Sequence, residues 1–138
     1  MKRYEQIPHT ADIAIRVYGK DLKELFINAA FGMFDIIADL EGLKSSVSID
    51  VNLKAPSKEE LLVSWLRELL YKFAGEKYLL RDFSIDEIDE KHLTGRARGE
   101  KFDMARHEIL KEIKAVTYYA LEVEKTKEGW TVQIIFDV

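Results

Sequence analysis

Two stretches of the chain repeat their hydrophobic residues every three or four positions, the period of an amphipathic helix. The first predicts a helix over residues 21–38, with its apolar stripe formed by Leu22, Leu25, Phe26, Ala29, Ala30, Met33, Phe34 and Ile37. The second predicts a helix over residues 58–74, with the stripe Leu61, Leu62, Trp65, Leu66, Leu69, Leu70 and Phe73. Each helix therefore has one face to bury.

Polar residues and a glycine mark the ends of these helices. Asp21 and Ser57 each stand three positions before a glutamate, Glu24 and Glu60 respectively. This spacing is typical of a capping box, in which both side chains bind backbone N–H groups of the first turn. Gly75 follows the second stripe and is expected to end that helix.

Elsewhere the hydrophobic period falls to two, which indicates strands with one buried face. Such strands are predicted at 13–17 and 47–53, with weaker candidates at 83–85 and 93–98 that an acidic turn over 86–90 connects. The last two strands are predicted at about 113–125 and 130–137. Residues 126–129 join them as a hairpin turn, in which Gly129 supplies a positive φ.

The order of these elements predicts the fold class. Strand, helix, strand, helix and then further strands favour an α+β domain with two layers. We expect a mostly antiparallel sheet with the two amphipathic helices on one face. Residues 1–138 show no repeat or long linker, so they are expected to form a single domain.

Composition narrows the classes of function. The chain has 138 residues, 47% of them hydrophobic, which is ordinary for a globular protein. The absence of cysteine excludes disulfides, thiolate metal sites and a cysteine nucleophile. No run of 18 apolar residues and no apolar leader is present, so a cytoplasmic location without membrane contact is expected. The net charge of −4 disfavours general binding to polyanions.

Oxygen ligands gather in two places that are far apart in the sequence. Pro8-His9-Thr10-Ala11-Asp12 precedes the strand at 13–17, and the last strand ends with Asp137 and Val138. If these two strands are neighbours, Asp12, Asp137 and the Val138 carboxylate can converge as a site for Ca²⁺ or for Mg²⁺ or Mn²⁺. The alternative is a turn in which Thr10 and Asp12 bind backbone N–H groups, beside a strand that ends in water.

A second candidate site is the basic stretch over residues 91–114. It holds seven Lys or Arg and four Asp or Glu, a balance of +3, whereas the rest of the chain carries −7. This asymmetry suits contact with phosphate or an acidic partner, for which Arg106, His107 and Lys114 are candidates together with His9. A solvated hairpin has the same composition. Phe102 is its one aromatic residue, so a stacking platform for single-stranded nucleic acid is poorly supported.

The sequence gives little support for catalysis. An imidazole can act as a general base, but His9 and His107 are distant in the chain. Motifs of the Gly-x-Ser-x-Gly, phosphate-loop and His-Glu-x-x-His kinds are absent. We therefore expect no catalytic residue and no independent enzymatic activity.

Three segments together resemble the archease family over nearly the full length of the chain. They are residues 8–12, residues 112–118 (Glu-Ile-Lys-Ala-Val-Thr-Tyr) and residues 134–138 (Ile-Ile-Phe-Asp-Val). The resemblance implies a chaperone-like α+β protein that assists the RtcB-type ligase of tRNA splicing by promoting ligase guanylylation and repeated turnover. It implies a metal site at Asp12, Asp137 and Val138. Tyr119 departs from the family pattern, which often has histidine there.

Two other functions fit parts of the same sequence. A metal-dependent phosphoester hydrolase would use the same carboxylates and would turn over simple phosphoesters. A small RNA-binding module would bind tRNA with a steep dependence on salt. The resemblance favours the ligase as the partner, with any tRNA contact being indirect.

Overall fold

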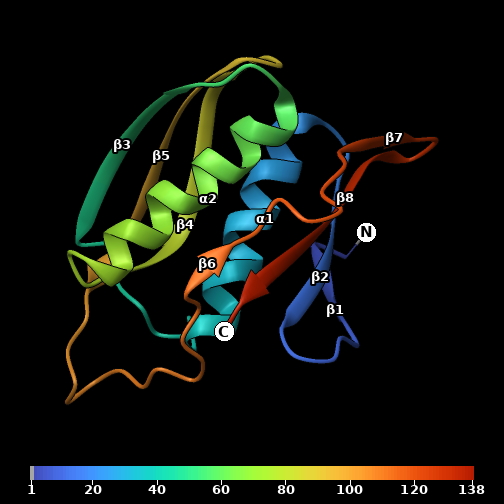
Figure 1. The fold of residues 1–138 in the computed structure, drawn as a ribbon. Coiled ribbons are helices and arrows are strands. Elements are labelled where there is room, and N and C mark those ends of the chain that lie inside the picture. Colours follow the sequence, from blue (N-terminus) through green and yellow to red (C-terminus); the bar gives the residue numbers. More distant parts are fainter. Residues whose placement is uncertain (1) are drawn as a thin grey trace.

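The computed structural model describes residues 2–138 and has, over this range, two helices and eight strands (Figure 1). The helices are α1 (Leu22–Ile37) and α2 (Lys58–Ala74). The strands are β1 (Tyr4–Ile7), β2 (Ile13–Gly19), β3 (Val47–Lys54), β4 (Tyr78–Ile88), β5 (His92–Lys101), β6 (Ala115–Val116), β7 (Glu124–Thr126) and β8 (Gly129–Asp137). The predicted α+β class is confirmed.

Both helices begin where their capping residues predict. The Asp21 carboxylate accepts a hydrogen bond from the Glu24 N–H at 2.8 Å, and the Ser57 hydroxyl accepts one from the Glu60 N–H at 3.2 Å. These bonds satisfy N–H groups that have no partner within the helix. The return bond of the first box differs from the motif, because Glu24 accepts from the N–H of Lys20, at 3.1 Å, rather than from that of Asp21.

The strands pair antiparallel throughout, but they divide between two sheets. One sheet has the order β1-β2-β8-β6, with β7 also paired to β8, and the other has the order β3-β5-β4. The second sheet is longer than predicted: β4 extends through Ile88, so most of the predicted acidic turn lies within a strand. The prediction did not include the division into two sheets.

The hydrophobic core lies between the helices and the two sheets. Helix α1 contacts β2 of one sheet and β4 of the other, and α2 packs on α1, β3, β4 and β6 (Figure 1). Phe26 and Trp65 are fully buried, and the indole N–H of Trp65 donates to the Phe26 carbonyl at 3.0 Å. The aromatic core of α2 is thus bonded to the backbone of α1. No helix within residues 2–138 has the length and hydrophobicity needed to cross a membrane.

The segment between β5 and β8 departs most from the prediction. A strand over 113–125 is wrong for most of its length, because only the two residues of β6 and the beginning of β7 pair with β8. After β6 the chain turns: the Leu121 N–H donates to the Tyr118 carbonyl at 3.1 Å, and Ala120 has a φ of 54°. The β7–β8 hairpin is present, and Gly129 has the predicted positive φ, 144°.

Candidate metal and partner-binding site

The pairing of β2 with β8 brings the two predicted carboxylates together. Ile13 pairs with Phe136 at the end of this antiparallel ladder. Asp12 immediately precedes β2 and Asp137 follows Phe136, so the two carboxylate residues flank the last pair of the ladder. The premise that the strand at 13–17 lies beside the C-terminal strand is confirmed.

One carboxylate oxygen at this position lacks a hydrogen-bond partner. Oδ1 of Asp12 is buried and accepts no hydrogen bond from residues 2–138. The Nδ1 atom of His9 lies beside it within ion-pair distance, and each side chain is about one-third exposed. A buried oxygen without a donor is uncommon, because burial removes the water that would otherwise solvate it. In this structure Oδ1 of Asp12 is thus held against the His9 imidazole, and a cation bound by this oxygen would share or displace that contact.

The residues at this end of the sheet are of the chemical type that a hard divalent cation selects. Asp137 is exposed, Val138 is partly buried against the core, and carboxylate oxygens are the ligands that Ca²⁺ and Mg²⁺ prefer. A grouping of three or more His, Cys, Asp or Glu side chains placed to hold an ion is not found within residues 2–138. His9, Asp12 and Asp137 would be three such side chains, so over the described residues they do not gather closely enough to form such a grouping.

Strand β6 fixes a cationic residue on the other side of β8. The Lys114 N–H donates to the Asp137 carbonyl at 2.7 Å, and Ala115 pairs with Asp137. The exposed Lys114 immediately precedes β6 and therefore lies beside Asp137. Thr117 bonds to the Ile135 backbone, and its hydroxyl is buried without a hydrogen-bond partner in the described chain.

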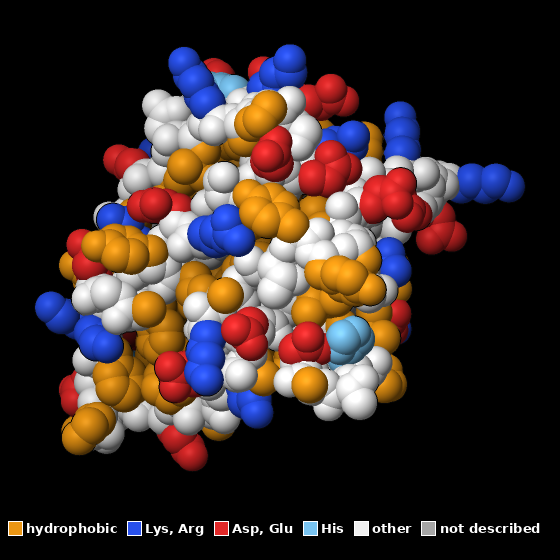
Figure 2. Space-filling model, in the orientation of Figure 1, with side chains coloured by type: hydrophobic (Ala, Val, Ile, Leu, Met, Phe, Trp, Pro, Cys, Tyr) orange, Lys and Arg blue, Asp and Glu red, His pale blue; other side chains and the backbone are white. Residues whose placement is uncertain are grey.

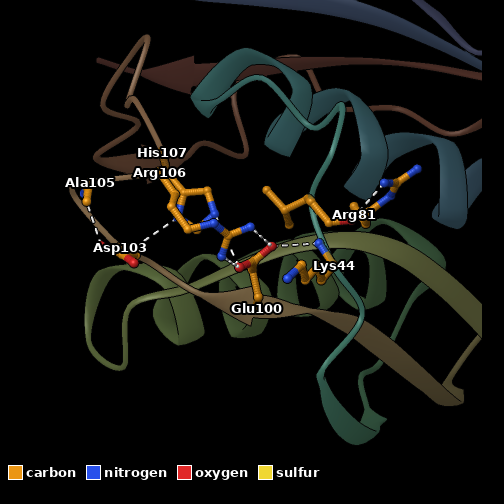
Figure 3. Close-up of polar contacts among 8 residues, drawn as sticks. Lys44, Arg81, Glu100, Asp103, Ala105, Arg106 and His107 are labelled. Atoms are coloured by element: carbon orange, nitrogen blue, oxygen red, sulfur yellow. Dashed lines mark hydrogen bonds and ion pairs between the residues drawn. The ribbon is translucent and has the colours of Figure 1, made fainter.

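Arg106 and His107 belong to a different cluster, built on β5 around Glu100 (Figure 3). Glu100 is only 5% exposed, and its carboxylate accepts hydrogen bonds from Arg106 and, at 2.6 Å, from the Lys44 N–H. The Arg106 hydrogen bond, followed by that of Lys44, lowers the pKa of Glu100 to about 2. The buried acid is thus held as a carboxylate.

The imidazole of His107 completes this cluster. Its Nδ1 atom accepts from the Asp103 N–H at 2.9 Å, which leaves Nε2 as the protonated nitrogen, 3.4 Å from a Glu100 oxygen (Figure 3). The His107 side chain is 7% exposed, whereas that of Arg106 is 44% exposed. Both side chains attach the loop after β5 to Glu100, and their predicted contact with a partner stays a prediction.

Comparison with known proteins identifies the family of this chain. The family model described as the archease protein family matches residues 4–138. "Protein archease" of Methanosarcina barkeri is 43% identical over 141 residues, which cover 99% of this chain and 97% of the relative. "Protein archease" of Pyrococcus furiosus is 39% identical over 142 residues, covering all of both chains. The chain belongs to the archease family.

Solved structures support the archease fold. The solution structure of a Methanobacterium thermoautotrophicum protein matches all of both chains with a TM-score of 0.85 at 35% identity. The crystal structure of an archease from Thermotoga maritima, described as a possible chaperone, has a TM-score of 0.64 at 21% identity and covers 97% of this chain. At that identity the second likeness concerns the fold alone.

Sequence reasoning missed two buried polar groups, Glu100 and the Thr117 hydroxyl. The sequence did not indicate that Glu100 is buried, because its hydrogen-bond partners come from loops, which have no periodic pattern of hydrophobic residues. Thr117 lies in the Glu112–Tyr118 segment that carries the family resemblance, but its buried hydroxyl depends on a turn that was predicted as strand. The predicted basic patch also divides, since Arg96 pairs with Asp50 on β3 while Arg106 pairs with Glu100.

Proposed function

We propose that this archease activates an RtcB-type RNA ligase in tRNA splicing, promoting guanylylation of the ligase and repeated turnover. The observation that carries the proposal is the β2–β8 ladder, which ends at Ile13 and Phe136 and so brings the neighbouring Asp12 and Asp137 to the same end of the sheet. Two carboxylates at the same end of a sheet are the type of ligand that a divalent cation binds. Membership of the archease family over residues 4–138 is consistent with an activating role of this kind.

Asp12, Asp137 and the Val138 carboxylate would hold a divalent cation of the Ca²⁺ or Mg²⁺/Mn²⁺ type. Bound there, the cation would supply positive charge that neutralises phosphate during nucleotidyl transfer. His9 lies against Asp12 and would orient its carboxylate, as outer groups around metal ligands do. Lys114, fixed beside Asp137, would contact the ligase or its nucleotide.

In this proposal the archease assists the ligase and does not itself catalyse a reaction. The description of the Thermotoga maritima relative as a possible chaperone is in keeping with an assisting role. The proposed ligand residues lie at the paired ends of β2 and β8, next to β6. Contact with tRNA would be indirect, through the ligase.

The decisive experiment measures guanylylation of the cognate ligase with limiting divalent metal, with and without the archease. We expect stimulation by the wild type. A ligase that is equally guanylylated with and without the archease, at every protein ratio, would refute the proposed function.

The carboxylates are tested by neutralising them. Asp12→Asn and Asp137→Asn should each weaken divalent-ion binding in calorimetric titration, because the ligand charge is lost at nearly constant size. Removing carboxylate repulsion should leave the melting temperature without metal unchanged or raised. Asp50→Asn, which neutralises an exposed carboxylate on the other sheet, is the matched control. Wild-type ion affinity in both site variants would exclude these side chains as ligands.

A further inference from the structure

A groove next to the carboxylate pair has the properties of a docking site. It lies between α2 and β6 and has a volume of about 290 Å³. Leu70, Ala74 and Val116 supply apolar surface, Tyr71 forms part of the wall, and Arg67 and Lys114 are its cations. We call it the α2–β6 groove. Figure 2 shows hydrophobic side chains interspersed with Lys and Arg on this face of the molecule.

The groove is built by contacts within the fold. Nη2 of Arg67 donates to the Val116 carbonyl at 3.1 Å, which satisfies a backbone group on the outer edge of β6. The same guanidinium lies over the Tyr118 ring, 4.7 Å from its centre. One side chain thus binds α2 to β6 and holds Tyr118 beside the groove. A preformed site of this kind loses little conformational entropy when a partner binds.

Large hydrophobic side chains around the groove are exposed to solvent. Tyr71 is 61% exposed, and Tyr118 and Tyr119, which follow β6, are 47% and 75% exposed. Exposed aromatic residues beside an arginine are the composition that dominates the energetic centres of protein interfaces. Exposed aromatic side chains beside an apolar groove are the features of an interaction surface. The groove and its tyrosines therefore indicate a partner.

The charge of the groove selects the kind of partner. Its charged lining residues are Arg67 and Lys114, whereas the whole chain carries −4. A carboxylate next to an apolar anchor residue would meet both cations and the apolar lining. A nucleic acid is less suited, because it carries a charge at every nucleotide, whereas the groove offers two cations and an otherwise apolar lining. A protein segment needs only one carboxylate at this position.

We propose that the α2–β6 groove binds an acidic segment of the partner ligase that inserts one apolar side chain, an inference that rests on the proposed function. The backbone hydrogen bond from Lys114 to Asp137 links the groove to the proposed cation site. Docking of the segment would therefore hold the carboxylate pair against the ligase.

The test compares two opposite charges at Ala74, an exposed residue at the last position of α2. Binding of purified ligase is measured by interferometry for the wild type, Ala74→Glu and Ala74→Lys, with Ser48→Glu on the solvent face of β3 as the matched control. Ala74→Glu should weaken binding by about tenfold or more, and Ala74→Lys much less, because only the carboxylate repels an acidic partner. Ser48→Glu should bind as the wild type does.

The outcomes separate this inference from the proposed function. Calorimetric ion affinity and melting temperature should be nearly the same in all four proteins. Wild-type ligase binding in both Ala74 variants would overturn the groove as the docking site, and equal losses in both would overturn the acidic partner. Binding of single-stranded RNA that Ala74→Glu abolishes would assign the groove to nucleic acid instead. A wild type that neither binds nor stimulates the ligase would refute the proposed function itself, and this inference with it.

Discussion

Glu100 is a charged residue whose position only the tertiary structure explains. It occupies β5 with 5% of its surface exposed, and it accepts from Arg106 and from the Lys44 N–H. The two donors come from loops on either side in sequence, 6 and 56 residues away. Because such contacts leave no periodic pattern, the sequence placed Glu100 among the charges of a solvated hairpin.

The pH dependence of stability should reveal this carboxylate. Its pKa in the folded protein is about 2, below the ordinary 4.5, so the folded state favours the ionised form. The stabilisation that Glu100 gives is therefore complete above about pH 4.5 and is lost as the pH falls toward about 2. Glu100→Gln should lower the free energy of unfolding by about 1–3 kcal/mol at neutral pH, as loss of a hydrogen bond to a buried charge does.

Urea denaturation of the wild type and Glu100→Gln over a series of pH values measures this effect. The gap between the two free energies of unfolding should narrow below about pH 4.5. A gap that stays constant down to the lowest pH at which both proteins fold would show that the charge of Glu100 contributes nothing. Asp12 and Asp137 differ from Glu100 in that the sequence singled them out, through the oxygen ligands at the ends of two predicted strands and through the family resemblance.

The helices could be predicted to within one residue because their signals are local. A stripe of apolar residues, a capping residue before it and, for α2, Gly75 after it are all contained in about twenty positions. The strand predicted over 113–125 failed for the opposite reason. Ala120 takes a positive φ there, a conformation that alanine does not signal, and the chain leaves the sheet after β6.

Truncating the buried faces of the helices should test their assignment. Phe26 and Leu66 are fully buried on α1 and α2, so Phe26→Ala and Leu66→Ala should each cost about 2–5 kcal/mol of stability. Tyr71→Ala removes a large side chain from the exposed face of α2 and should cost less than about 1 kcal/mol. Chemical denaturation checks all three. Similar losses for Leu66→Ala and Tyr71→Ala would mean that the buried face of α2 is assigned wrongly.

The β7–β8 hairpin depends on the glycine at its turn. Gly129 has a φ of 144°, and a Cβ atom there would lie 2.3 Å from the Gly19 carbonyl oxygen. Gly42 also has a positive φ, 78°, but a Cβ atom would meet nothing within 4 Å. Gly129→Ala should therefore destabilise the protein by about 1–3 kcal/mol, and more than Gly42→Ala. Thermal unfolding compares the two variants. Equal losses of stability would show that the positive φ, and not the close approach to Gly19, determines the effect.

At the scale of the whole molecule, the two sheets and their helices decide which distant residues meet. The sequence predicted strands and their faces, but the division into sheets depends on pairings such as β3 with β5 that span about forty residues. Local patterns do not encode such partners. The one long-range pairing that the sequence did suggest, β2 with β8, came from the carboxylates at their ends rather than from the strands themselves.

The final prediction concerns the β2–β8 pairing and the last residue of the sequence. Adding a few glycines after Val138 turns its carboxylate into a neutral amide and moves the charge at least one residue, about 3.3–3.6 Å, away. The register of β2 with β8 keeps Asp12 and Asp137 in place, so two of the three proposed ligands remain.

Cation affinity in calorimetric titration should therefore fall without vanishing, and stimulation of the ligase at limiting metal should fall with it. The same glycines placed before Met1 should change neither quantity. If the last strand merely ends in water, both extensions should behave as the wild type does. Equal activity of the two extended proteins would remove Val138 from the ligand set and leave the proposed activation of the ligase intact, because that rests on the carboxylate pair and on the family.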